Sequence, residues 1–259
     1  MSDATIYAHV ADGVASVFIN RPEKKNCLSL AMWRRLGEEF EGLGSRRDVR
    51  CIVLSGVGDC FCAGADIGEF AEARRDAASA HTYEAVTEKT VGIISQCPKP
   101  TIAAIRGIAM GGGCGIALAC DVRVADRTAR MGISAARLGL VYPGLEAMLL
   151  FNQVGLARAK QILFTGNHFD AQKSYELQLV DLLVDDLDKA VSDLVQSIIR
   201  NAPLSLKAMK FILNSAAHGT VERDAARIVE LFDLAANSAD AREGAAAFLA
   251  RRAPIFTGE

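Results

Sequence analysis

Two segments of the sequence could do chemistry with backbone N–H groups rather than with side chains. Residues 110–121 read MGGGCGIALACD, with four glycines in the first six positions. Each glycine costs roughly 0.5–1 kcal/mol relative to alanine in regular structure, so the cluster must serve tight packing or a close approach to the backbone. Residues 56–70, GVGDCFCAGADIGEF, likewise follow a strand pattern and lead into a helical one.

A glycine-rich turn that opens a helix presents N–H groups that lack partners within the helix and carry partial positive charge. An anion or a polarised carbonyl oxygen can therefore approach them. Neither segment is a phosphate loop, because GVGDCF lacks the third glycine of GxGxxG and GGGCGIA contains no GK[ST]. Two interpretations remain: tight turns where helices press on a sheet, or two N–H groups that together form an oxyanion hole.

The elements that must position these loops alternate between strand and helix patterns. Apolar, β-branched runs are found at residues 14–20, 51–57, 101–107, 121–126 and 179–184. Between most of them lie helical patterns, one of which has Ser29 as its expected N-cap and begins its apolar face at Trp33. A second helical region is expected over about 66–95. This alternation predicts an α/β fold.

The last third of the chain is mainly helical. Pro203 opens PLSLKAMKFILN at the helix position where the missing proline N–H costs nothing. Asp240 is expected to cap a last helix that runs through Arg252. We therefore predict an α/β core over residues 1–195 and a helical C-terminal section over residues 196–259 that belongs to the same fold.

The composition argues against several classes of function. The chain has 259 residues, of which 51% are hydrophobic and 23% charged, and its formal charge of −2 does not favour nucleic acid or an anionic membrane as partner. Its seven cysteines contain no CxxC pair, which favours reduced thiols in the cytoplasm over a disulfide framework. The four histidines are scattered, so no metal is expected. We see no signal pattern and no apolar run of ~20 residues, and expect a cytoplasmic protein without a membrane span.

Six segments, in order, resemble the crotonase (enoyl-CoA hydratase/isomerase) superfamily and cover about residues 14–258. They are FINRPEKKNCLS, FCAGADIGEF, KPTIAAIRGIAMGGGCGIALACDVRVA, LFTGNHFDAQKSYELQLVD, APLSLKAMKFILN and DAREGAAAFLARRAPIFTGE. The resemblance implies an α/β, crotonase-like spiral of ββα units, whose C-terminal helices build a homotrimer or homohexamer. It also implies a coenzyme A thioester as substrate, with no separate cofactor.

The resemblance further implies an oxyanion hole, but the usual acids are missing. The two amides map to Ala65 in AGAD and to Gly112, the middle of the three glycines. Hydratases of the family place glutamates where this chain has Gly115 and Ala135. A third acidic position, used by some dienoyl-CoA isomerases and a dehalogenase, falls on Pro143. Ordinary enoyl-CoA hydration is therefore not expected.

The resemblance also implies where coenzyme A binds. Its adenine end would lie along the backbone near Ala63, Asp66 and Ile67, while Lys24 or Lys25 would meet its phosphates. Residues near the C-terminus of a neighbouring subunit would complete this site: Arg251, Arg252 and Phe256.

Three interpretations of the function stay open. Glu146 could move a proton between carbons in a reaction of the hydratase or isomerase type. Tyr142 and Ser134 match hydroxyl-bearing positions of methylmalonyl-CoA decarboxylases in the superfamily, and loss of CO2 leaves an enolate without a base. The third interpretation is a non-catalytic homologue that binds CoA thioesters. The sequence does not identify the acyl group.

Overall fold

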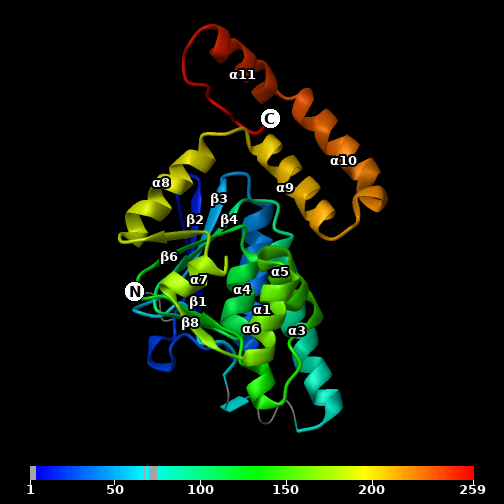
Figure 1. Ribbon diagram of the computed structural model, residues 1–259. Helices are drawn as coiled ribbons and strands as arrows, with labels where there is room; N and C mark the ends of the chain where they lie inside the picture. Colours follow the sequence, from blue (N-terminus) through cyan, green and yellow to red (C-terminus); the bar gives the residue numbers. More distant parts are fainter. Residues whose placement is uncertain (1–3, 67, 70–74) are drawn as a thin grey trace.

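Six strands form the central sheet (Figure 1), in a computed structural model that describes residues 4–66, 68–69 and 75–259. The strand order is β1-β2-β3-β4-β6-β9; the first pair is antiparallel and every later pair is parallel. The strands are β1 (Ile6–Ala11), β2 (Val14–Ile19), β3 (Cys51–Gly56), β4 (Thr101–Ile105), β6 (Val122–Asp126) and β9 (Leu182–Val184).

A second, three-stranded sheet carries the glycine-rich turn. It consists of β5 (Ile108–Met110), β7 (Arg130–Gly132) and β8 (His168–Asp170), in the order β5-β7-β8. The Gly111 N–H donates to the carbonyl oxygen of Gly132 at 2.9 Å, which holds the turn after β5 against the end of β7. This hydrogen bond therefore fixes the position at which the helix after the turn begins.

Helices cover both faces of the central sheet. On β3, Ile52 and Leu54 belong to the main core, whereas the alternate residues Cys51 and Val53 pack with α8 (Leu187–Ile199). Because strand side chains alternate between faces, α8 lies opposite the main core. The main-core side carries α1 (Leu30–Ser45), α3 (Ala77–Ser95), α4 (Gly112–Ala119), α5 (Gly144–Val154), α6 (Leu156–Thr165) and α7 (Ala171–Glu176).

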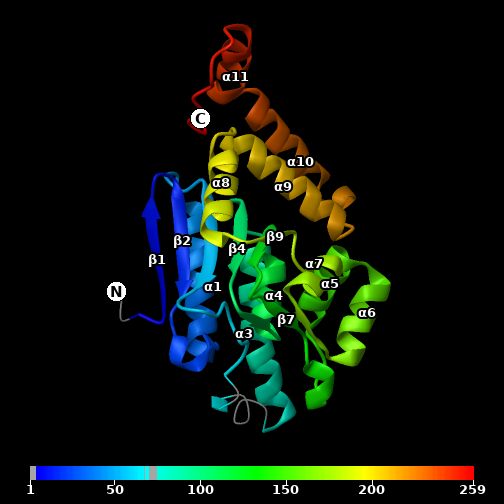
Figure 2. The same ribbon diagram turned by 60° about the vertical axis from the view of Figure 1, so that its left-hand side comes forward.

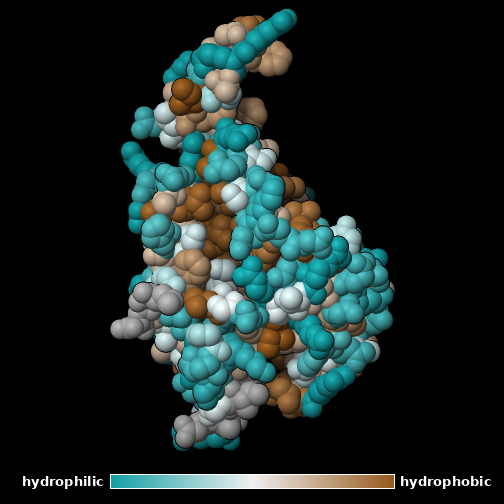
Figure 3. All heavy atoms as spheres, turned by 90° about the vertical axis from the view of Figure 1, so that its left-hand side faces the viewer, coloured by the Kyte–Doolittle hydropathy of each residue, from teal (hydrophilic) through white to brown (hydrophobic). Residues whose placement is uncertain are grey.

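The C-terminal helices α9 (Pro203–Ala217), α10 (Val221–Ala236) and α11 (Ala239–Leu249) extend away from this core (Figure 2). Lys210 of α9 anchors them, because its Nζ donates to Asp121 Oδ2 at 2.7 Å and to the Lys99 carbonyl oxygen at 3.0 Å. Figure 3 shows apolar surface between the C-terminal section and the core.

Most sequence expectations for the elements are confirmed, and the α/β fold is among them. Ser29 caps α1 by accepting the Met32 N–H at 3.2 Å, and Pro203 is the first residue of α9. The expectation for Asp240 was wrong: Ser238 caps α11, and the Asp240 carboxylate accepts N–H groups of the C-terminal tail instead. The division after residue 195 falls within α8 and stays a prediction.

Candidate active site

The Ala65 and Gly112 amides lie close together on two paired loops. The Cys62 N–H donates to the Ile108 carbonyl oxygen at 2.9 Å, and the Cys62 carbonyl oxygen accepts the Met110 N–H at 3.0 Å. A Cβ atom placed on Gly112 would lie 3.9 Å from the Ala65 nitrogen. Within the described residues, neither the Ala65 nor the Gly112 N–H has an acceptor. Both remain available to one incoming oxygen.

Close packing accounts for two of the surrounding glycines. A Cβ on Gly113 would lie 2.2 Å from the Cys62 carbonyl oxygen, far inside van der Waals contact. Gly64 has a φ of +95° and would place a Cβ 2.6 Å from the Met110 carbonyl oxygen. The tight-turn interpretation is therefore correct for these positions, and the same packing brings the two amides together.

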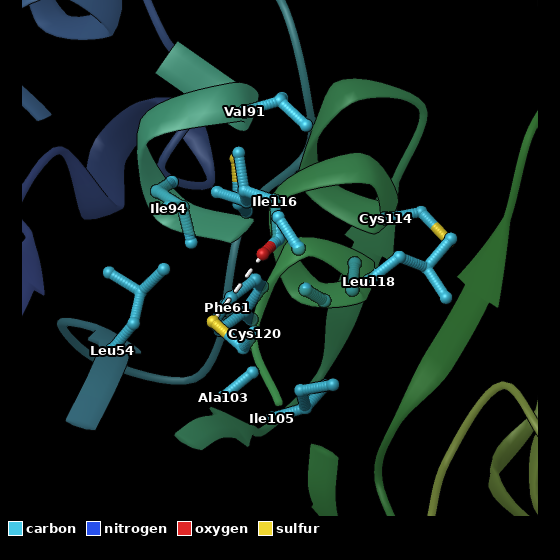
Figure 4. Close-up of a cluster of buried hydrophobic side chains, with 14 of the residues drawn as sticks. Leu54, Phe61, Val91, Ile94, Ala103, Ile105, Cys114, Ile116, Leu118 and Cys120 are labelled. Carbon is cyan, nitrogen blue, oxygen red and sulfur yellow. Dashed lines mark hydrogen bonds between the residues drawn. The ribbon is translucent and has the colours of Figure 1, made fainter. Parts of the chain in front are cut away.

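Helix α4 is a buried support for these groups. Its side chains Cys114, Ile116 and Leu118 lie inside the core: Ile116 is on the side toward Val91 and Ile94 of α3, and Cys114 and Leu118 are on the opposite side (Figure 4). A short helix enclosed on its apolar sides has little freedom to shift. The Gly112 N–H at its first turn is therefore held in one direction.

Glu146 and Tyr142 fill the space beside Gly115. A Cβ on Gly115 would lie 3.1 Å from both Glu146 Cγ and the Tyr142 hydroxyl oxygen. Gly112 and Gly115 are three residues apart on α4 and so share one face of the helix. Glu146 belongs to the first turn of α5 and is only 3% exposed. Helix α5 thus places a carboxyl group against the face of α4 that carries no side chain at Gly115.

Burial governs the charge state of this pair. It raises the pKa of Glu146 to about 7, and the charges of Glu88 and Glu84 on α3 act in the same direction. Glu146 Oε2 has no hydrogen-bond partner in the described part of the chain. Burial also raises the pKa of Tyr142, whose hydroxyl donates to the Gly111 carbonyl oxygen at 3.5 Å. Tyr142 is therefore a neutral donor, whereas Glu146 changes charge near neutral pH.

Trp33 is a member of this site that the sequence analysis placed only on an apolar helix face. Its ring covers Gly112, because a Cβ there would lie 2.8 Å from Trp33 Cζ2. The side chain is 1% exposed, and its Nε1 has no partner within the described residues. The sequence offered one signal for this role. Trp33 lies on an apolar helix face, and a buried indole N–H usually has an acceptor, so a polar group was to be expected near it.

Ser134 is less closely tied to the site. It precedes a short 3₁₀ helix, η2 (Ala135–Leu138), and its carbonyl oxygen accepts the Arg137 N–H at 3.0 Å. No hydrogen bond joins its hydroxyl to Tyr142 or Glu146 among the described residues. The structure brings together Gly115, Tyr142 and Glu146, and in the described residues the Ser134 hydroxyl makes no hydrogen bond to this group.

The predicted coenzyme A segments lie beside each other. The Lys25 carbonyl oxygen accepts the Ala63 N–H at 3.0 Å, and the side chains of Lys24 and Lys25 are exposed. The Asp66 carboxylate pairs with the Arg21 guanidinium at 2.6 Å, which holds the pKa of Asp66 below its usual range. Ile67 lies outside the described residues.

The predicted C-terminal contributors stand apart from α4 within this chain (Figure 1). Arg252 pairs with Glu243 at 2.6 Å and lowers the pKa of that carboxyl to about 2. The Phe256 carbonyl oxygen accepts a hydrogen bond from Arg50 at 2.7 Å, and Arg251 is exposed. None of them lies near the Ala65 and Gly112 amides of this chain (Figure 1).

Other kinds of site find no support in the described residues. No group of histidine, cysteine or acidic side chains there could hold a metal ion. In the same residues, no helix combines the length and apolarity that crossing a membrane requires. All seven cysteines are free thiols.

The fold and the paired loops define a crotonase-type protein, and comparison with known proteins confirms this class. Residues 9–259 match the family model for enoyl-CoA hydratase/isomerase. The chain therefore belongs to the enoyl-CoA hydratase/isomerase family, as its sequence segments indicated.

Relatives span the whole chain. It is 32% identical over 260 residues to the 1,2-epoxyphenylacetyl-CoA isomerase of Escherichia coli K12, covering 98% of each chain. It is 33% identical over 242 residues to the 2,3-dehydroadipyl-CoA hydratase of the same organism, covering 93% of each. An enoyl-CoA hydratase/isomerase family structure from Hyphomonas neptunium superposes with a TM-score of 0.94 at 32% identity, covering 99% of this chain and 98% of that one. The crotonase-like fold is thereby confirmed.

Proposed function

We propose that this protein is an acyl-CoA enzyme of the hydratase/isomerase type that stabilises a thioester enolate with the Ala65 and Gly112 N–H groups. Glu146 is the group that moves the proton. The observation that carries the proposal is the placement of the Glu146 carboxyl beside Gly115, buried, with Oε2 unpartnered, about one helical turn (~5 Å) along α4 from Gly112.

The geometry supports a double-bond isomerisation. The thioester carbonyl oxygen would accept both N–H groups, which makes the α-carbon more acidic and stabilises the enolate oxygen. The Glu146 carboxylate takes the α-proton, and the protonated Glu146 returns it at the γ-carbon, so the C=C bond moves by one position without net oxidation. A carboxyl whose pKa is about 7 can take up and release a proton at neutral pH.

The test is Glu146→Gln, which keeps shape and removes the base. We expect turnover of enoyl-CoA substrates and exchange of the α-proton in D2O to fall by 10²-fold or more. Glu176→Gln, on an exposed glutamate of α7, is the matched control and should keep full activity. Full turnover by Glu146→Gln would refute the mechanism. Tight acyl-CoA binding with no product from any thioester would instead support a non-catalytic homologue.

Decarboxylation is the second candidate, favoured by the Tyr142 hydroxyl beside the Gly115 position. A neutral phenol can hydrogen-bond a departing carboxylate, and the resulting enolate would use the same two amides. Release of CO2 from a malonyl-type thioester, lost in Tyr142→Phe and kept in Glu146→Gln, would select this reaction. The same measurement in Ser134→Ala tests the second hydroxyl.

We also propose a homotrimer or homohexamer, in which a neighbour supplies Arg251, Arg252 and Phe256 to the coenzyme A site. The exposed apolar side chains of α9–α11 and the tail support an interface between copies: Met209, Leu213, Val229, Phe232, Phe248, Leu249 and Ile255. No cofactor beyond the substrate's coenzyme A enters the proposal, and the free thiols fit a cytoplasmic location.

A further inference from the structure

A cavity of about 680 Å³ lies where the C-terminal section joins the core. Its walls come from the end of α1 and the following loop, the segment before β4, the start of α9 and the C-terminal tail. We call it the junction cavity. Its lining is strongly basic and includes Arg46, Arg47, Arg50, Lys99 and Lys207.

Several of these cations form no ion pair in the described part of the chain. Within the described residues, Arg47, Lys99 and Lys207 make no side-chain hydrogen bond or ion pair. Lys210, one turn further along α9, is by contrast paired with Asp121 at 2.7 Å. Partial burial and the charges of Lys207 and Arg50 lower the pKa of Lys99, and the charge of Asp48 opposes them. Folding therefore brings like charges from the core and from α9 against each other.

The start of α9 adds to the positive potential. Its N-cap, Ala202, offers no side-chain acceptor, and the Leu204 N–H has none within the described residues. The positive end of the helix dipole therefore lies at the cavity wall. Glu259 is the one acidic side chain among the described lining residues, and the lining residue Arg46 forms an ion pair with Asp48.

We propose that the junction cavity binds a phosphate-type dianion, which joins the C-terminal helical section to the core by neutralising cations from both. The amino groups of Lys99 and Lys207, the Arg47 guanidinium and the start of α9 all line this cavity, and each is a donor that a phosphate oxygen can accept. The bound group is inorganic phosphate or the phosphate of a small organic molecule. The inference does not depend on the reaction proposed above.

The experiment measures binding by calorimetry and the thermal midpoint of unfolding at constant ionic strength, with chloride replaced stepwise by inorganic phosphate. We expect saturable binding and a saturable rise of the midpoint. The double variant Lys99→Met and Lys207→Met keeps the apolar stems and should weaken binding about tenfold or more. Lys160→Met, on an exposed lysine of α6, removes one charge outside the cavity and should bind as the wild type does.

A parallel titration with adenosine monophosphate distinguishes inorganic phosphate from the phosphate group of a small organic molecule as the bound species. Saturation by inorganic phosphate identifies the free ion, whereas saturation by the nucleotide alone identifies an organic phosphate. Lys207→Met alone serves as a second variant. Because it removes the repulsion between Lys207 and Lys99, its thermal midpoint of unfolding in chloride should not fall below that of the wild type. Absence of saturable binding by either probe, or equal binding by the double variant, would overturn the proposal.

Discussion

At the residue scale, the principal feature is the Glu146 carboxyl group, which belongs to α5 and lies beside Gly115 of α4. Residue 115 is glycine, and two side chains lie beside it: Glu146 in the first turn of α5 and Tyr142 two residues before that helix. Trp33 covers the neighbouring Gly112. The chemistry available at this face of α4 therefore depends on groups that come from α1 and α5.

The pH dependence follows from Glu146. Its folded-state pKa of about 7 lies above the ordinary value of 4.5, so the folded protein binds this proton more tightly than the unfolded chain. The associated stability is fully present below pH 4.5 and is lost as the pH rises through 7. Relative to Glu146→Gln, we expect the wild type to lose on the order of 3 kcal/mol of unfolding free energy over this interval. Urea unfolding at pH 4.5 and pH 8 measures the difference, and a constant gap would contradict it.

Placing the carboxyl group on α4 instead of α5 tests whether the side chains of residues 115 and 146 occupy the same volume. Gly115→Glu alone should destabilise the protein by roughly 1–3 kcal/mol, because its Cβ would press on Glu146 and Tyr142. Combining it with Glu146→Gly should recover part of that loss, because it empties the volume that the new side chain enters. Purely additive stabilities in the double-mutant cycle would show that the two side chains do not share the space.

At the element scale, the paired loops act as one unit because their backbones touch. The segment around Cys62 runs parallel to β5, and α4 starts directly afterwards with no room for a side chain at its second residue. The positions of the two amides are therefore coupled through backbone hydrogen bonds rather than through side chains.

A pair of glycine substitutions tests this packing. Gly113→Ala should destabilise the protein by roughly 3 kcal/mol or more, because the new Cβ meets the Cys62 carbonyl oxygen at 2.2 Å. Gly42→Ala, at an exposed position of α1 with no atom within 4 Å of the new Cβ, should stabilise it by about 0.5–1 kcal/mol. Thermal unfolding of the two variants decides the point; equal effects would contradict it.

At the scale of the whole molecule, α10 and α11 make few contacts with their own core and expose large apolar side chains (Figure 1). Phe232 is 67% exposed and Phe248 is 84% exposed. Apolar surface gathered on one protruding section is typical of an interface. This surface supports the proposed interface between copies of the chain.

Phe232→Glu places a charge on that surface, and we expect it to lower the molar mass in solution to that of the monomer. Phe232→Tyr keeps the aromatic area and should leave the assembly intact. Light scattering after size-exclusion chromatography measures both. An unchanged mass for Phe232→Glu would remove this face of α10 from the interface.

The chain's own sequence determined the family and the α/β fold, and it predicted the two candidate amides, because these depend on local motifs such as AGAD and GGG. Strands β1, β5, β7 and β8 were not predicted; three of them have only three residues, too few for a clear pattern. Only the tertiary structure placed Glu146 beside Gly115 and Trp33 over Gly112. Those residues are 31 and 79 positions from their partners, and the packing of α5 and α1 against α4 brings them together.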